Sequence, residues 1–194
     1  MIKNKQLIIN SSGVTLIELL IVVAVMLILM GVSFVGYKQR GEELGLKRAA
    51  YKVMADIEQV RETAMSSQKL SSGDVPKGGW GIHFNTTLPN EYIIFADKTL
   101  TPNHFYDSGT EGSGTDGFKK IVLDEDNRIE ISLLSPTIPP NSLDVVFLPP
   151  SPDVFINGFS PSLSEAKITV RLSNYPSKTK TIIINSVGLI TISN

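Results

Sequence analysis

The sequence predicts an α+β fold in which one long N-terminal helix packs on a C-terminal antiparallel β-sheet or two-sheet β domain. Two observations lead to this prediction. Apolar residues first run without interruption and then recur at helical spacing, and no proline occurs before Pro76. From Trp80 onward, roughly seven or eight short segments show strand patterns separated by polar turns.

The chain begins with a short polar leader, residues 1–13, which carries Lys3 and Lys5 and no acid. The apolar run that follows, residues 14–36, has 23 residues, or roughly 35 Å of helix. A hydrocarbon core is about 30 Å thick, so residues 14–37 are predicted to be the transmembrane half of the helix. The two lysines then place the N-terminus in the cytoplasm and the C-terminal domain outside.

One carboxylate, Glu18, interrupts the apolar run near its start. A charge inside a membrane segment is costly, so this residue needs a partner or a function. An uncleaved signal anchor is the simplest interpretation of the run, because no small-residue cleavage site follows it, but it leaves the glutamate unexplained. A glutamate at the membrane edge that simply reaches water is a further alternative.

The residues Gly13-Val-Thr-Leu-Ile-Glu18-Leu-Leu resemble the class III signal of type IV pilins and of type II secretion pseudopilins. The resemblance implies that a prepilin peptidase cuts after Gly13 on the cytoplasmic side and methylates the new N-terminal residue, Val14. It also makes Glu18 the glutamate of the fifth mature position, to which the family assigns the register of assembly. The family usually has phenylalanine at the position of Val14.

The register role has an independent physical basis. Cleavage creates a free α-amino group at Val14, and Glu18 lies about 6 Å further along the helix axis. When helices stack with an axial offset, the carboxylate of one subunit can neutralise the ammonium of its neighbour. Leaving either group unpaired in apolar surroundings costs several kcal/mol, so the pair would set the offset.

The resemblance implies a minor pilin or pseudopilin of a type IV pilus or a type II secretion pseudopilus. Subunits of DNA-uptake machines have the same N-terminal signal and helix, so the sequence does not distinguish these machines. Its expected partners are prepilin peptidase, other pilin or pseudopilin subunits in a helical filament, the inner-membrane assembly platform and, before assembly, the membrane. The expected location is the cytoplasmic (inner) membrane, with a single pass, and then a periplasmic or extracellular filament. The alternative is a signal-anchored exported β-domain binding protein that does not polymerise.

Beyond the apolar run the pattern becomes amphipathic, and residues 38–70 are predicted to form the second half of the helix. Apolar residues recur there in alternating steps of four and three, which marks a single buried face: Leu46, Ala50, Val53, Ile57, Val60 and Ala64. The whole helix is expected to have about 55 residues. The Gly- and Pro-containing segment 71–79 ends it, and a β-rich globular domain is expected over 75–194.

Strand patterns fill that domain, at residues 80–84, 91–97, 119–123, 129–134, 143–148, 166–172, 181–185 and 189–192. Two hairpins are expected: one across the polar turn 124–128, and one at the end of the chain, where Gly188 supplies a positive φ. The blocks 79–84 and 91–97 and the final hairpin resemble the β domain of H-type minor pseudopilins and related minor pilins.

Candidate catalytic groups are few, because the chain has two histidines and no cysteine. His83 lies opposite the apolar face of its strand and is expected to face solvent, and His104 lies in a loop without a serine–acid triad. The segment 112–117 formally matches a dinucleotide fingerprint but neither follows a strand nor opens a helix, so it is expected to be a flexible loop. No catalytic residue and no cofactor is expected, and the protein is not expected to be an enzyme.

Two weaker candidates concern ligands. Since some relatives bind calcium in loops of this domain, Asp107, Glu111 and Asp116 are weak candidates for a metal site, but their spacing is not that of an EF-hand and a solvated acidic loop is favoured. A basic patch of Lys119, Lys120, Lys178 and Lys180 would lack interleaved aromatic residues. With a net charge of -1, the chain gives no reason to expect nucleic acid as a partner.

Overall fold

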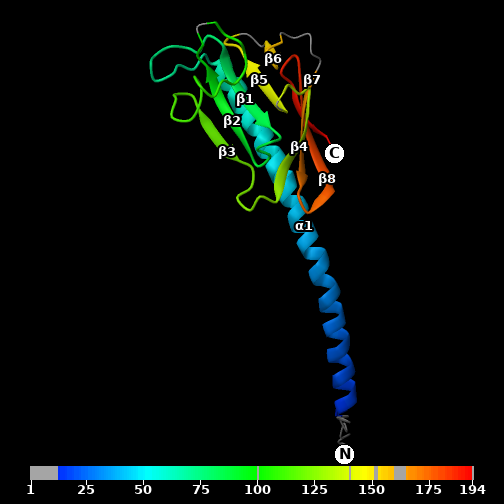
Figure 1. Ribbon diagram of the computed structural model, residues 1–194. Coiled ribbons are helices and arrows are strands. Elements are labelled where there is room, and N and C mark those ends of the chain that lie inside the picture. The colour runs from blue at the N-terminus through cyan, green and yellow to red at the C-terminus, as the bar shows by residue number, and fades with distance from the viewer. Residues whose placement is uncertain (1–12, 100, 140, 151–152, 160–164, 194) are drawn as a thin grey trace, which may run out of the picture. The chain divides into compact units, whose positions relative to one another are not determined.

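The computed structural model describes most of the chain, with the side chains of 32–39 excepted: residues 13–99, 101–139, 141–150, 153–159 and 165–193 (Figure 1). The chain forms two compact units, Met1–Gly41 and Glu42–Asn194. Helix α1, Leu16–Met65, has 50 residues and is the helix expected from the sequence. The β strands all lie in the second unit. This is the predicted α+β fold.

The first unit contains the apolar part of α1. Every large apolar side chain from Val14 to Met30 is exposed, by 47% to 84%. Among the residues whose side chains are described, no helix is both long and apolar enough to cross a membrane. Part of the predicted span, residues 32–37, lies outside the described side chains.

Two antiparallel sheets make up the second unit. The five-stranded sheet has the order β3-β2-β1-β5-β6, with bounds β1 Gly79–Asn85, β2 Glu91–Asp97, β3 Lys119–Val122, β5 Ser142–Phe147 and β6 Val154–Ile156. The four-stranded sheet has the order β4-β7-β8-β9, with bounds β4 Ile129–Ser135, β7 Glu165–Leu172, β8 Tyr175–Asn185 and β9 Ile190–Ser193. Both sheets and the second half of α1 contribute to one hydrophobic core.

The helix face predicted from the spacing is the buried face. Each of its six residues is at most 3% exposed: Leu46, Ala50, Val53, Ile57, Val60 and Ala64. Alternating steps of four and three keep these side chains on one side of a 3.6-residue helix, where they meet the sheets. The prediction of an amphipathic half packed on the domain is therefore confirmed.

Polar contacts fix this half of α1 against both sheets. Lys52 Nζ donates to the carbonyl of Val122 in β3 at 2.9 Å, and an Arg61 guanidinium nitrogen donates to the carbonyl of Gly188 after β8 at 2.7 Å. The Tyr92 hydroxyl on β2 donates to the Asp56 carboxylate. Burial, together with this hydrogen bond to Asp56, raises the pKa of Tyr92, so the phenol stays protonated and continues to donate.

The hairpin expected across residues 124–128 is wrong. β3 pairs with β2 in one sheet, whereas β4 pairs with β7 in the other. Asp124 Oδ2 accepts the backbone N–H and the Nε–H of Arg128, at 3.1 and 3.2 Å, so the polar segment closes on itself while the chain crosses between sheets. The hydrogen bonds to Asp124 also raise the pKa of Arg128. A polar turn marks where a strand ends, but it does not select the next strand's partner.

The final hairpin is confirmed. β8 and β9 pair through Ile184 and Ile190, and Gly188 has a φ of 77° in the turn between them. Two details differ from expectation. β8 begins at Tyr175 rather than at residue 181, and the three-residue β6, among the prolines after β5, was not predicted.

Candidate functional site

The predicted processing site immediately precedes α1. Gly13 and Val14 are exposed and non-helical, and the helix begins at Leu16. Thr15 is its N-cap: the Thr15 Oγ1 accepts the backbone N–H of Glu18 at 3.3 Å, and the Thr15 carbonyl accepts the N–H of Leu19 at 3.2 Å. The spacing Thr-x-x-Glu is that of a capping box, a signal present in the sequence that the sequence analysis did not use.

Glu18 is the acidic residue of the first helical turn and is exposed. A negative charge there is favoured by the partial positive charge of the helix N-terminus. Cleavage after Gly13, methylation of Val14 and the register role of Glu18 stay predictions at this point.

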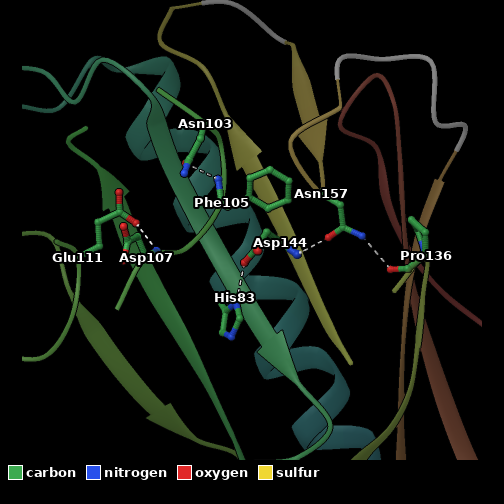
Figure 2. A network of polar contacts seen from close by, with 8 residues as sticks. All are labelled: His83, Asn103, Phe105, Asp107, Glu111, Pro136, Asp144 and Asn157. Carbon is green, nitrogen blue, oxygen red and sulfur yellow. Dashed lines mark hydrogen bonds and ion pairs between the residues drawn. The ribbon is translucent and has the colours of Figure 1, made fainter. Parts of the chain in front are cut away.

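A second candidate region lies on the face of the five-stranded sheet that α1 does not cover, and here the expectation for His83 is wrong. The His83 side chain is 14% exposed, and its Nδ1 lies 2.6 Å from an Asp144 carboxylate oxygen (Figure 2). Asp144 is directly opposite His83 in the β1–β5 pairing. Strand alternation placed His83 away from the core, but the loop between β2 and β3 packs there, with the Tyr106 ring 4.7 Å from the imidazole.

Asp144 is held in turn by Asn157, which is 1% exposed. The Asn157 Oδ1 accepts the Asp144 backbone N–H at 2.9 Å, and the Asn157 N–H donates to the Asp144 carbonyl at 2.8 Å. The Asn157 Nδ2 donates to the carbonyl of Pro136 at 3.1 Å. Figure 2 shows this continuous chain of contacts from Pro136 to His83.

His104 has a structural environment. Its backbone N–H donates to the fully buried Asp97 carboxylate at 3.0 Å, and its Nδ1 lies 3.0 Å from the carbonyl of Gly78. Its ring stacks on Phe155 at 4.0 Å. Asp97 also accepts the N–H and the hydroxyl of Thr99, at 3.1 and 2.6 Å, and so anchors the start of the β2–β3 loop.

The expectation of a solvated acidic loop is wrong for one of its three acids, because Glu111 is only 1% exposed. Its Oε2 accepts the N–H of Asp107 at 3.0 Å, and its Oε1 has no hydrogen-bond partner among the described residues. Burial, aided by the nearby Asp97 carboxylate, raises the pKa of Glu111 to about 7. Burial is also the first cause of the raised pKa of Tyr106, with the Glu111 charge next.

The other two metal candidates have separate partners. Asp107 Oδ1 accepts the N–H of Gly109 at 2.9 Å, and the Asp116 carboxylate accepts the N–H of Ser71. The part of the chain that the structure describes holds no group of three or more His, Cys, Asp or Glu residues placed to bind a metal ion.

The four lysines of the suggested basic patch come from different sheets. Lys119 and Lys120 lie on β3, whereas Lys178 and Lys180 lie on β8. Lys120 pairs with Glu91 at 2.9 Å and Lys178 with Glu43 at 2.7 Å. These ion pairs offset part of the positive charge that a nucleic acid would need.

Comparison with known proteins gives one positive result, at the N-terminus. No curated protein and no solved structure matches the chain. Residues 9–34 match the family model of the prokaryotic N-terminal methylation motif, and this segment includes Gly13, Val14 and Glu18. The chain therefore carries a prokaryotic N-terminal methylation motif that ends within the apolar part of α1, consistent with the class III signal that the sequence resembles.

Proposed function

We propose that this protein is a prepilin-type structural subunit, a minor pilin or pseudopilin. In this proposal prepilin peptidase cuts after Gly13 and methylates Val14, and the subunit is then assembled into a type IV pilus or a type II secretion pseudopilus. The observation that carries the proposal is the methylation motif over residues 9–34, which includes the first part of α1, where every large apolar side chain up to Met30 is exposed.

The exposed apolar helix supports a change of surroundings during the life of the subunit. Large apolar side chains around the whole circumference, at least 47% exposed from Val14 to Met30, are unfavourable in water. The subunit is first held in the cytoplasmic membrane by a single pass, with its N-terminus in the cytoplasm. The assembly platform then transfers the same helix to the core of a periplasmic or extracellular filament, where neighbouring helices replace lipid.

Glu18 is the proposed register residue within that core. Thr15 caps the helix directly ahead of it, which keeps the Glu18 carboxylate about one helical turn from the ammonium that cleavage creates at Val14. An offset neighbour then brings its own ammonium to this carboxylate. A subunit placed at another offset would leave both charges unpaired in apolar surroundings.

We propose a structural and not a catalytic role for the second unit. His104, Asp107 and Asp116 all have nearby structural partners in the loops that they stabilise. The exposed loops of this unit would contact other proteins of the machine.

The mature N-terminus tests the proposal. Mass spectrometry of the protein from cells that possess a prepilin peptidase should find an N-terminal peptide that begins with methyl-valine at Val14. Cells lacking the peptidase should yield the uncut chain, and a Gly13→Leu variant should remain uncut in both. An intact leader on wild-type protein in peptidase-containing cells would refute the proposal and favour the signal-anchored binding protein.

Assembly tests the register residue separately. Glu18→Gln removes the charge at nearly constant size, and we expect it to be cut normally but to lose at least 90% of its incorporation into sheared filaments, a roughly tenfold effect for about 1.4 kcal/mol. Glu125→Gln, an exposed glutamate of the second unit, is the matched control and should incorporate normally. Equal incorporation of both variants would exclude the charge pairing while leaving cleavage intact.

A further inference from the structure

A cavity of about 370 Å³ opens between strands β1 and β2 and the β2–β3 loop. Its lining includes His83, Asn85, Leu88, Ile93, Tyr106 and Ser108. This volume lies within the range of small-molecule sites, which typically measure about 300–1,000 Å³. The filament proposal does not use it.

His83 is presented to this cavity in a fixed orientation. Its Nδ1 faces Asp144, and Figure 2 shows its Nε2 on the opposite side of the ring, away from that carboxylate. The Tyr106 ring, which itself packs edge-on against Phe95 at 5.4 Å, restricts the imidazole from the side. In the neutral imidazole that donates Nδ1–H to Asp144, Nε2 keeps its lone pair and accepts a hydrogen bond.

His83 is held by two buried polar side chains, an unfavourable arrangement if the imidazole only fills space. Asp144 and Asn157 are 2% and 1% exposed, and burying polar side chains is unfavourable unless all their hydrogen bonds are made. The same sheet face is otherwise closed by apolar groups, with Phe95 and Val146 both adjacent to Gly81. In binding sites, the side chain that contacts the ligand is often held in place by hydrogen bonds from buried neighbours, as Asp144 and Asn157 hold His83 here.

The polar side chains that line the cavity offer both hydrogen-bond donors and hydrogen-bond acceptors. Asn85 Oδ1 already accepts the N–H and the hydroxyl of Thr87, at 2.8 and 2.7 Å, so its Nδ2 is the atom left to donate. His83 Nε2 accepts, and the Ser108 hydroxyl can do either. The carboxylate of Glu91, which also lines the cavity, is neutralised by Lys120 at 2.9 Å.

This combination selects a class of ligand. The carboxylate of the lining, Glu91, is paired with Lys120 from outside the lining, so neither an anion nor a cation is specifically favoured. Leu88, Ile93 and Tyr106 provide apolar contact on the remaining side. A sugar ring matches both properties, because its neighbouring hydroxyls each donate and accept while its C–H face is apolar.

We propose that this cavity binds a neutral saccharide unit of a glycan, with one sugar hydroxyl donating to His83 Nε2 and a second accepting from Asn85 Nδ2. Asp144 and Asn157 act as positioning residues that hold the imidazole. The proposal is independent of filament assembly, because it requires only the second unit of the chain.

The test uses the full chain in lipid nanodiscs, or in a detergent without a sugar headgroup so that the detergent cannot compete. A glycan array identifies bound neutral glycans, and isothermal titration with the best free oligosaccharide measures Kd. His83→Phe keeps a ring against Tyr106 but removes both nitrogens, and we expect it to weaken binding at least tenfold. Tyr175→Phe is the control, because it changes a 40% exposed aromatic residue on β8, outside the cavity lining, and should bind like wild type.

A second variant protects the test against loss of folding. Leu88 is 52% exposed at the cavity, so Leu88→Glu should block the site without disturbing the core, and should also weaken binding at least tenfold. Folding of each variant is checked by Trp80 fluorescence, since this residue is buried. Absence of glycan binding by folded wild-type protein would overturn the proposal. So would undiminished binding by Leu88→Glu, or capture of peptides and not of glycans.

Discussion

The two parts of α1 are built from similar apolar residues but differ in how these are arranged. From Val14 to Met30 they surround the helix and all the large ones are exposed, whereas after Glu42 most of them follow one stripe that is almost fully buried, and only Leu44, Tyr51 and Met65 are exposed large apolar residues there. A stripe needs one covering surface, which the chain's own sheets supply. A helix that is apolar all round needs apolar surroundings on every side, and the first unit by itself does not supply them. The arrangement of apolar residues thus separates intramolecular packing from packing against lipid or other subunits.

The largest expected effect contrasts one isoleucine from each part. Ile57 is fully buried, so Ile57→Ala should lower the free energy of unfolding of the second unit by about 2–5 kcal/mol. Ile21 is 56% exposed, so Ile21→Ala should change it by less than about 0.5 kcal/mol. Urea unfolding followed by Trp80 fluorescence gives both values, and similar losses for the two variants would contradict the contrast.

The next effect is a pH dependence that belongs to the second unit. The pKa of Glu111 is raised to about 7 in the folded chain, so the folded state keeps a proton that the unfolded state releases near its ordinary value of 4.5. The resulting stabilisation is complete below 4.5 and is lost as the pH rises to 7, at about 1.4 kcal/mol per unit and roughly 3 kcal/mol in total. The Asp97 carboxylate opposes the ionisation of Glu111, whereas hydrogen bonds from the backbone of Asp107 and Lys98 favour the ionised form and offset part of the rise in pKa.

Urea titrations between pH 4.5 and 8 measure this dependence. Glu111→Gln cannot ionise, so it should lack this component and should be more stable than wild type at pH 8. Asp107→Asn, on the exposed neighbour, should retain the wild-type slope. A Glu111→Gln profile parallel to that of wild type would assign the dependence to other groups.

A smaller effect concerns the start of the apolar part. Thr15→Val keeps the shape of the side chain but removes the oxygen that accepts the Glu18 N–H, and it should destabilise the first turn by about 1 kcal/mol. Hydrogen exchange at the Glu18 amide should accelerate roughly fivefold. Unfolding of the second unit should not change, and a change there would mean that the two parts are energetically coupled.

The smallest effect is at an exposed ion pair. Lys178 and Glu43 lie 2.7 Å apart with 45% and 43% of their side chains exposed, so solvent screens their attraction. Lys178→Met should alter the free energy of unfolding by at most about 1 kcal/mol in urea titration. A larger loss would show that the stripe of α1 depends on charge as well as on burial.

The sequence predicted those features that depend on local periodicity. The stripe from Leu46 to Ala64 and the turn at Gly188 were correct because each follows from spacing or from one residue's φ. The hairpin across residues 124–128 was wrong because β3 pairs with the preceding strand β2 while β4 pairs with β7, and local spacing does not decide such pairings. His83 and Glu111 were wrongly placed in solvent for a related reason, since the β2–β3 loop packs over His83 and folds so that its own Glu111 is buried.

The Thr15 cap also has a consequence for proteolysis. Inside a helix the backbone N–H and C=O groups are already paired, whereas those ahead of the N-cap are open to hydrogen bonding with another protein. Gly13 and Val14 lie ahead of the N-cap, and the helix begins two residues beyond the proposed cleavage site. The proposed cleavage after Gly13 would therefore need no turn of the helix to unwind.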